Sequence, residues 1–269
     1  MLSLSVLKEA LSYVRQAVLS ALKSAEAEKV IGVGAYGTPS RAIDLVAERA
    51  FVEYMKQHNV RCTILSEESG VLDINGGGDL IVLDPLDGTL NALRGIPMFT
   101  SSIAVASGGD FKDIYASVVM NLLTGDLYYA KKGEGAFLNG RRIHPSSINR
   151  LEDAIIDFPL NIMKVPWYLQ MIAPVMRRTA HVRFLGSVSL SICLVASGAL
   201  DGFVDLRGLL RIVDIAGATF IAKEAGCLLD DGKGEGFNPE LSIKTRTSVI
   251  VACNRYLLEQ ILSLLSFKK

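Results

Sequence analysis

Apolar residues at three- and four-residue spacing predict two helices near the start of the chain. The apolar positions of the first helix are Leu4, Leu7, Leu11, Val14, Val18 and Leu22, and those of the second are Ile43, Ala47, Ala50 and Tyr54. Three glycines within residues 32–37 separate the two helices and predict a mobile loop. The segment Thr38-Pro39-Ser40 is typical of a helix start.

The pattern then changes to short runs rich in β-branched and aliphatic residues, which predict strands. We expect strands at 62–66, 80–83, 101–107, 114–121 and 127–130, with turns at 108–109, 124–125 and 139–140. This half is predicted to place two helices on an antiparallel sheet.

From about residue 151, predicted strands and helices alternate. We expect strands at 154–157, 181–185, 202–206 and 249–253, and helices at 166–178, 187–197, 212–225 and 256–265. Such alternation is typical of an α/β lobe. The predicted fold class is therefore α/β, with an α+β lobe at 1–145 and an α/β lobe at 146–269.

Composition excludes several classes of function. Lys+Arg and Asp+Glu both number 28, and this neutral balance argues against a general nucleic-acid or membrane-surface binder. No apolar run reaches the roughly 18 residues of a membrane span, and the charged N-terminus lacks a signal pattern, so we expect a cytoplasmic protein. The four cysteines form no CxxC pair and only three histidines occur, so we expect buried free thiols and no zinc site.

The segment 84–89, Asp-Pro-Leu-Asp-Gly-Thr, is the most informative part of the sequence. Asp84 and Asp87 stand at the end of an apolar strand, where their charges need compensation. Carboxylate and carbonyl oxygens suit Mg²⁺, so both aspartates and the carbonyl of Leu86 are candidate ligands. Gly88 and Thr89 begin a predicted helix whose free N–H groups suit a phosphate. On spacing alone, an ordinary acidic turn remains the alternative.

Two further acidic segments can contribute to the same site. Glu67 and Glu68, flanked by serines, follow an apolar strand and can bring a carboxylate to the same sheet edge. Asp214 lies at the start of an apolar helix. Each alone is equally typical of a solvated charge or a helix N-cap, and the sequence does not show that they converge.

Taken in order, the segments 66–69, 84–89 and 213–218 resemble the inositol monophosphatase family over nearly the whole chain. The likeness is strongest to the archaeal branch, whose members often act both as inositol monophosphatases and as fructose-1,6-bisphosphatases. It implies a five-layer α/β/α/β/α sandwich and a homodimer. It also implies a Mg²⁺-dependent phosphoric monoester hydrolase that acts on a small phosphorylated sugar or polyol.

The resemblance further implies two to three Mg²⁺ ions per site, with Mn²⁺ as a substitute. The first would be bound by Glu68, Asp84 and the Leu86 carbonyl, and the second by Asp84, Asp87 and Asp214. Glu67 is expected to orient the site from behind these ligands. A third, looser ion would be recruited near Glu68 and the mobile loop.

The resemblance assigns the remaining roles as well. Gly88 and Thr89 would bind the phosphate, while Asp44 and Thr89 would polarise a water molecule that hydrolyses the ester directly. The expected substrate contacts are Arg183, Gly186, Ser187, Asp205, Arg207 and Arg211. The arginines suit a second phosphate, and the alternative for each is a surface ion pair. For Asp44 the alternative is an exposed helix charge.

One of the departures from the archaeal pattern lies in the loop. Where an acid commonly precedes the last glycine of the loop, this chain has Tyr36, a poor Mg²⁺ ligand, which puts a third metal ligand from the loop in doubt. Two other functions stay open. They are a 3′-phosphoadenosine 5′-phosphate nucleotidase, whose relatives usually carry insertions, and a catalytically silent relative that binds metal or a protein partner.

Overall fold

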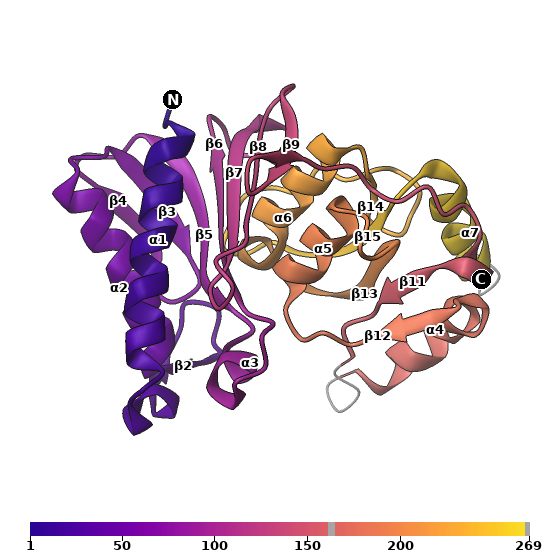
Figure 1. The fold of residues 1–269 in the computed structure, drawn as a ribbon, viewed down its shortest axis with the longest axis horizontal. Coiled ribbons are helices and arrows are strands. Elements are labelled where there is room, and N and C mark those ends of the chain that lie inside the picture. The colour runs from indigo at the N-terminus through magenta and orange to yellow at the C-terminus, as the bar shows by residue number, and fades with distance from the viewer. Residues whose placement is uncertain (161–164, 267–269) are drawn as a thin grey trace.

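The computed structural model describes residues 1–160 and 165–266 as two lobes side by side, each built on one sheet (Figure 1). The first sheet has eight strands in the order β10-β9-β8-β7-β6-β5-β3-β4, and the second has five in the order β12-β11-β13-β15-β14. A separate two-stranded ribbon, β1–β2, lies at the edge of the first lobe.

The first lobe contains three α-helices within the described residues: α1 (Leu4–Ala21), α2 (Ala42–Gln57) and α3 (Thr89–Arg94). Its strands are β1 (Val30–Val33), β2 (Pro39–Arg41), β3 (Cys62–Ser66), β4 (Gly70–Ile74), β5 (Asp79–Asp87), β6 (Thr100–Ala106), β7 (Ile114–Asn121), β8 (Leu127–Lys131), β9 (Gly135–Leu138) and β10 (Arg141–Arg142).

The second lobe contains the helices α4 (Pro166–Arg178), α5 (Val188–Ala196), α6 (Ile212–Ala225) and α7 (Arg255–Ser266). Its strands are β11 (Ile155–Asp157), β12 (His181–Arg183), β13 (Gly202–Arg211), β14 (Leu228–Asp230) and β15 (Arg246–Ala252). All of its predicted helices and strands are present, with ends shifted by a few residues.

The helices divide the molecule into five layers (Figure 1). Helices α1 and α2 pack on the outer face of the first sheet, α5 and α6 fill the space between the two sheets, and α4 and α7 cover the second sheet. Three apolar cores lie between these layers. The predicted α/β class and α/β/α/β/α sandwich are therefore confirmed.

Three local predictions needed correction. The segment Pro39–Arg41 is strand β2, because it pairs with β1 before α2 begins at Ala42. The first sheet is antiparallel except for the β3–β5 pair, which is parallel. The short strands β4 and β14 lacked a clear sequence signal, because each is a short edge strand with no long apolar run.

The two lobes share the apolar core that surrounds α5 and α6. Strand β10 ends at Arg142 and β11 begins at Ile155, so the predicted division after residue 145 falls in the connection between the sheets. The core that surrounds α5 and α6 combines residues from both sheets. We retain the division at 145 as a proposal for two lobes that fold together.

Two observations concern membrane-spanning helices and cysteines. Within the described residues, no helix has the length and apolarity needed to cross a membrane. The four cysteines are buried and free, as predicted.

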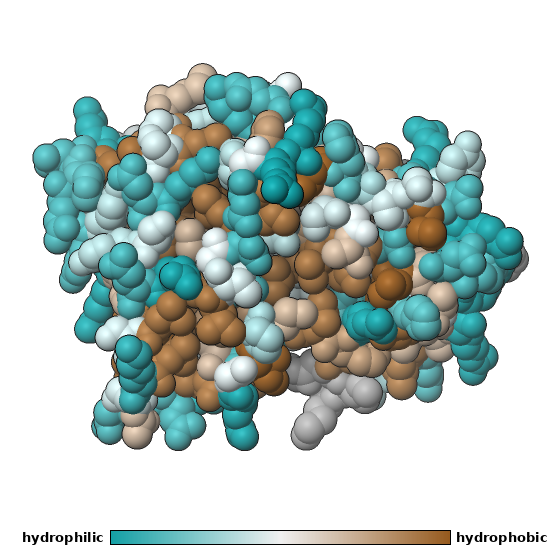
Figure 2. All heavy atoms as spheres, in the orientation of Figure 1, coloured by the Kyte–Doolittle hydropathy of each residue, from teal (hydrophilic) through white to brown (hydrophobic). Residues whose placement is uncertain are grey.

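Figure 2 shows apolar side chains gathered around the lower part of the first lobe, over the region of α3. Leu90 of α3 is 63% exposed and Ile96, just after it, is 46% exposed.

Helix α6 approaches the first sheet most closely at Gly217. A Cβ there would lie 3.0 Å from the carbonyl oxygen of Ile103 and would also meet the hydroxyl of Ser102. The Ser117 hydroxyl donates to the Gly217 carbonyl at 2.8 Å. The missing side chain thus allows α6, which carries Asp214, to pack against the sheet.

We expect Gly217→Ala to lower the free energy of unfolding by about 1–3 kcal/mol, because overpacking outweighs the better helix propensity of alanine. Urea denaturation would measure this. Gly109→Ala is the control, since a Cβ there meets nothing within 4 Å, and its effect should stay within about 0.5 kcal/mol. A Gly217→Ala protein more stable than the wild type would contradict the packing described here.

Candidate metal and phosphate site

A β-bulge at the end of β5 sets the positions of the two aspartates. Asp84 pairs with Ser102 on β6, and the next paired residue, Asp87, lies opposite Thr100. Residues 85 and 86 therefore face a single residue of β6, and the first of them is a proline, which has no N–H for the ladder. The bulge keeps both carboxylates at the carboxyl end of β5.

The turn after β3 is fixed from behind by Glu48 of α2. The buried carboxylate of Glu48 accepts hydrogen bonds from the hydroxyls of Ser66 and Ser69 and from the Ser69 amide. This holds Glu67 and Glu68 next to the end of β5, since β3 and β5 are adjacent parallel strands. Sequence reasoning missed Glu48, and the two serines that flank the glutamates were the only signal.

Asp214 is presented by the first turn of α6. The amide of Arg211 donates to the Asp214 carboxylate at 3.0 Å, which caps the helix. The Arg211 guanidinium donates to the same carboxylate at 2.6 Å and also forms an ion pair with Glu67. Arg211 therefore bridges a carboxylate of each lobe.

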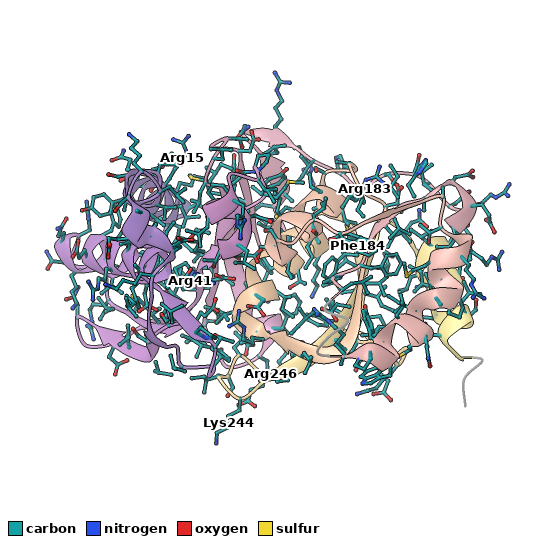
Figure 3. The ribbon with its side chains drawn as sticks, turned by 90° about the horizontal axis from the view of Figure 1, so that it is seen from below. Arg15, Arg41, Arg183, Phe184, Lys244 and Arg246 are labelled. Atoms are coloured by element: carbon teal, nitrogen blue, oxygen red, sulfur yellow. The ribbon has the colours of Figure 1, made fainter. Side chains whose placement is uncertain are left out.

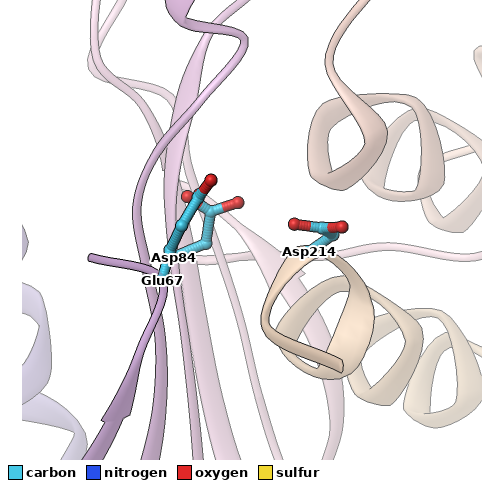
Figure 4. Close-up of side chains that lie close together, drawn as sticks. All are labelled: Glu67, Asp84 and Asp214. Carbon is cyan, nitrogen blue, oxygen red and sulfur yellow. The ribbon is translucent and has the colours of Figure 1, made fainter. Parts of the chain in front are cut away.

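Three carboxylates converge where the lobes meet (Figure 4). One oxygen each of Glu67, Asp84 and Asp214 lies within 4.8 Å of the others. Asp84 lies on β5 and Glu67 in the turn after β3, while Asp214 faces them from the start of α6. These separations suit oxygen ligands around one divalent cation, because metal–oxygen bonds of about 2.0–2.6 Å place ligand atoms a few ångströms apart.

The charges of these carboxylates are poorly compensated by the protein itself. Burial, followed by the charges of Glu67, Asp87 and Asp214, raises the pKa of Asp84 well above its usual value. Burial raises the pKa of Asp87 to about 6 and that of Glu67 to about 8, although Arg211 opposes the second shift. Because a bound cation would reverse these shifts, the donor set fits a divalent metal.

The two glutamates after β3 lie in different environments. Glu67, predicted to stand behind the ligands, lies in the cluster, whereas Glu68, predicted to be a ligand, does not belong to it. The Glu68 carboxylate accepts a hydrogen bond from the Ser40 hydroxyl and lies next to Gly34 of the loop. Both glutamates lie in the turn after β3, and this turn directs Glu67 toward Asp84 and Glu68 toward Ser40 and the loop.

Asp87 connects the first lobe to the start of α5. It accepts hydrogen bonds from the Ser187 hydroxyl at 2.6 Å and from the Ser189 amide at 2.7 Å. Gly186, which precedes Ser187 in the sequence, has a φ of 78°. Asn91 of α3 donates to the carbonyl oxygen of Leu185 at 2.9 Å and was not predicted. The predicted residues Asp87, Gly186 and Ser187 therefore lie together.

Thr89 and Asp44 form the predicted pair. The Thr89 hydroxyl lies 2.8 Å from Asp44 Oδ1 and 3.2 Å from the Leu86 carbonyl oxygen, and it can donate to either. Asp44 is buried, so the alternative of an exposed helix charge is wrong. Gly88 has a φ of 85°, and a Cβ there would lie 2.7 Å from the Met98 carbonyl oxygen, so the turn requires glycine.

The predicted substrate arginines have three different environments. Arg211 belongs to the carboxylate cluster, as described above. Arg207 donates from two nitrogens to Asp205, at 2.9 and 2.5 Å. Asp205 is fully buried, which revises its predicted contact with a substrate hydroxyl: its carboxylate orients Arg207 instead.

Arg183 differs from the other two because its side chain is exposed. It ends β12 and lies beside Phe184 in the second lobe (Figure 3). Its guanidinium donates to the Val182 carbonyl at 3.0 Å, and among the described residues it has no ion pair with a carboxylate. Of the three predicted substrate arginines, Arg183 is therefore the one most available to an anionic ligand.

Comparison with known proteins decides the family. The model of the inositol monophosphatase family matches residues 3–269. The chain belongs to this family. It is therefore a phosphoric monoester hydrolase by family, and the carboxylate cluster is a group that can hold the metal on which this family depends.

Individual relatives support the same conclusion. The chain is 40% identical over 262 residues to a fructose-1,6-bisphosphatase/inositol-1-monophosphatase of Methanothermobacter thermautotrophicus, covering 94% of this chain and 92% of that one. An enzyme of the same description from Archaeoglobus fulgidus is 38% identical and covers 98% of both chains. A crystal structure of an inositol monophosphatase-fructose 1,6-bisphosphatase superposes with a TM-score of 0.86, at 31% identity, covering 98% of this chain and 100% of that one.

The raised pKa values predict how metal-free stability depends on pH. When folding raises the pKa of a carboxylate, ionisation of that carboxylate costs more free energy in the folded state than in the unfolded state, so ionisation destabilises the fold. Stability therefore falls as the pH rises from about 4 through the folded pKa values of about 6 for Asp87 and about 8 for Glu67. In EDTA at pH 8, we expect Asp84→Asn to unfold at higher urea concentration than the wild type. The expected difference is at least about 1 kcal/mol, since one pKa unit corresponds to about 1.4 kcal/mol.

This difference should shrink toward pH 5, and Mg²⁺ should stabilise the wild type but not Asp84→Asn. A variant less stable than the wild type in EDTA at pH 8 would show that the carboxylates do not repel one another as described.

Proposed function

We propose that this protein is a Mg²⁺-dependent phosphatase that hydrolyses inositol-1-phosphate and fructose-1,6-bisphosphate. The cluster of Glu67, Asp84 and Asp214 beside the Thr89–Asp44 pair carries this proposal. The names of the archaeal relatives support the two substrates. Carboxylate and carbonyl ligands favour Mg²⁺, with Mn²⁺ as a substitute.

Two cations suit the geometry better than three. Asp84 would be shared, with Glu67 and the Leu86 carbonyl on one side and Asp87 and Asp214 on the other. Glu68 is engaged by Ser40, and Tyr36 replaces the acid of the loop, so neither favours a third cation. Binding would require Arg211 to release part of its hold on Glu67 and Asp214.

The bound cations would neutralise phosphate charge and make a nearby water more acidic. The Thr89 hydroxyl can accept a hydrogen bond from the attacking water while it donates to Asp44, which takes up the proton. The water oxygen bonds to phosphorus as the ester bond breaks, and the leaving oxygen regains a proton from solvent. Gly88 and Thr89 would hold the phosphate at the start of α3. Positioning and charge neutralisation would supply most of the rate enhancement.

The substrate would lie between the lobes, next to the turn that carries Gly186 and Ser187. Arg183, exposed beside this turn, is the proposed contact for a second phosphate. We further propose a cytoplasmic homodimer, in keeping with the buried free cysteines and with the exposed Leu90 and Ile96.

Phosphate release, measured in Mg²⁺ and in EDTA, tests the function. We expect release from inositol-1-phosphate and fructose-1,6-bisphosphate only with the metal. Asp84→Asn should lose several orders of magnitude in kcat while remaining folded, because Asp84 would bind both cations. Near-normal activity of this variant would refute the site. Release from 3′-phosphoadenosine 5′-phosphate alone would favour the nucleotidase, and no release from any substrate would favour the silent metal binder.

Arg183→Ala tests the proposed second-phosphate contact. We expect kcat/KM for fructose-1,6-bisphosphate to fall by about tenfold or more, in line with the loss of a charge-assisted hydrogen bond. The value for inositol-1-phosphate, which has one phosphate, should change little. Arg177→Ala, an exposed arginine at the end of α4, is the matched control. Equal losses on both substrates would remove Arg183 from the specificity site.

A further inference from the structure

The loop between β1 and β2 lies directly on the turn that carries the glutamates. The Ala35 amide donates to the carbonyl oxygens of Glu67 and Glu68, at 3.1 and 2.9 Å. Gly34 is so close to the Glu68 carboxylate that a Cβ there would lie 3.0 Å from it. The loop therefore packs on the turn that carries Glu67, one of the three clustered carboxylates.

Tyr36, at the tip of this loop, contacts the other lobe. Its ring centroid lies 5.3 Å from the Arg211 guanidinium carbon and 4.8 Å from that of Arg246, both within the range of a cation–π interaction. Arg211 ends β13 and caps α6, and Arg246 begins β15. The ring also packs against the core that contains α5 and α6. The loop thus joins the two lobes across the site.

Both guanidiniums are held in place independently of the tyrosine. Arg211 is fixed by its ion pairs with Glu67 and Asp214. Arg246 donates to the carbonyl oxygens of Ile243 and Thr245, at 3.1 and 3.0 Å. Figure 3 shows Arg246 near Lys244. The ring therefore meets two cations whose positions are already set.

The tyrosine hydroxyl contributes no hydrogen bond to this arrangement. It is buried and has no hydrogen-bond partner within the part of the chain that the structure describes. Since an unpaired buried hydroxyl costs stability, the ring rather than the hydroxyl must hold Tyr36 in place. Phenylalanine should then serve as well as tyrosine.

We propose that Tyr36 holds the β1–β2 loop closed over the carboxylate cluster through Arg211 and Arg246, before any metal binds. The site covered is the one proposed above, so this role rests on the proposed function. Tyr36 is a positioning residue: its ring meets two fixed guanidiniums and thereby keeps the loop against the turn of Glu67 and Glu68. Closure of the loop in this chain does not require a metal ligand on the loop itself.

Hydrogen exchange, measured by mass spectrometry on peptides that cover residues 30–41, tests the proposal in EDTA and in Mg²⁺. We expect the wild-type loop to be protected in EDTA and to gain little from Mg²⁺. Tyr36→Phe should match the wild type, whereas Tyr36→Leu should exchange about tenfold faster in EDTA because both cation–π interactions are lost. Tyr256→Leu, a 67% exposed tyrosine on α7, is the matched control. Peptides from β5 and β6 report whether each variant keeps its fold.

Any of three results would overturn the proposal: a wild-type loop protected only after Mg²⁺ is added, a Tyr36→Leu loop that exchanges like the wild type, or a Tyr36→Phe loop that exchanges like Tyr36→Leu. Exchange in EDTA needs neither substrate nor turnover. A protein inactive on every phosphate ester would therefore refute the proposed function while leaving this test intact.

Discussion

Repulsion among buried carboxylates is the constraint on which the rest of this structure depends. Burial, together with the negative charges of neighbouring carboxylates, raises the pKa values of Glu67, Asp84 and Asp87, and Arg211 is the cation that partly balances these charges. Such an arrangement costs stability in the metal-free protein and persists only because the surrounding structure holds it. The bulge of β5, the carboxylate of Glu48 and the cap of α6 each hold one part of it.

The site is assembled by the packing of the five layers, and no single lobe contains it. Asp87 needs the start of α5, Asn91 supports the turn before that helix, and Asp214 reaches Asp84 because α6 packs tightly on the first sheet at Gly217. The shared core around α5 and α6 therefore determines the distances between the carboxylates. Stability and chemistry depend on the same contacts here.

Much of the fold was predictable because its elements have strong periodicity. Helix α1, strands β3 and β7 and the alternating second lobe all followed from apolar spacing, and the 84–89 motif located the aspartates. The choice between Glu67 and Glu68 was beyond such reasoning, because it depends on which way the chain leaves β3. Glu48 and Asn91 act through residues far away in the sequence, and no local pattern marks them. The ion pair that makes Asp205 inaccessible likewise appears only in three dimensions.

The hydrogen bond between Ser187 and Asp87 has a consequence for how such chains can diverge. The Ser187 hydroxyl donates to a carboxylate of the first lobe and also accepts from the Leu190 amide, which caps α5 of the second lobe. A chimera that joined these lobes from different relatives would have to inherit both partners together. Recombination in the connection near residue 145 would separate Ser187 from Asp87. The hydrogen bond between them therefore requires the two halves to come from the same relative.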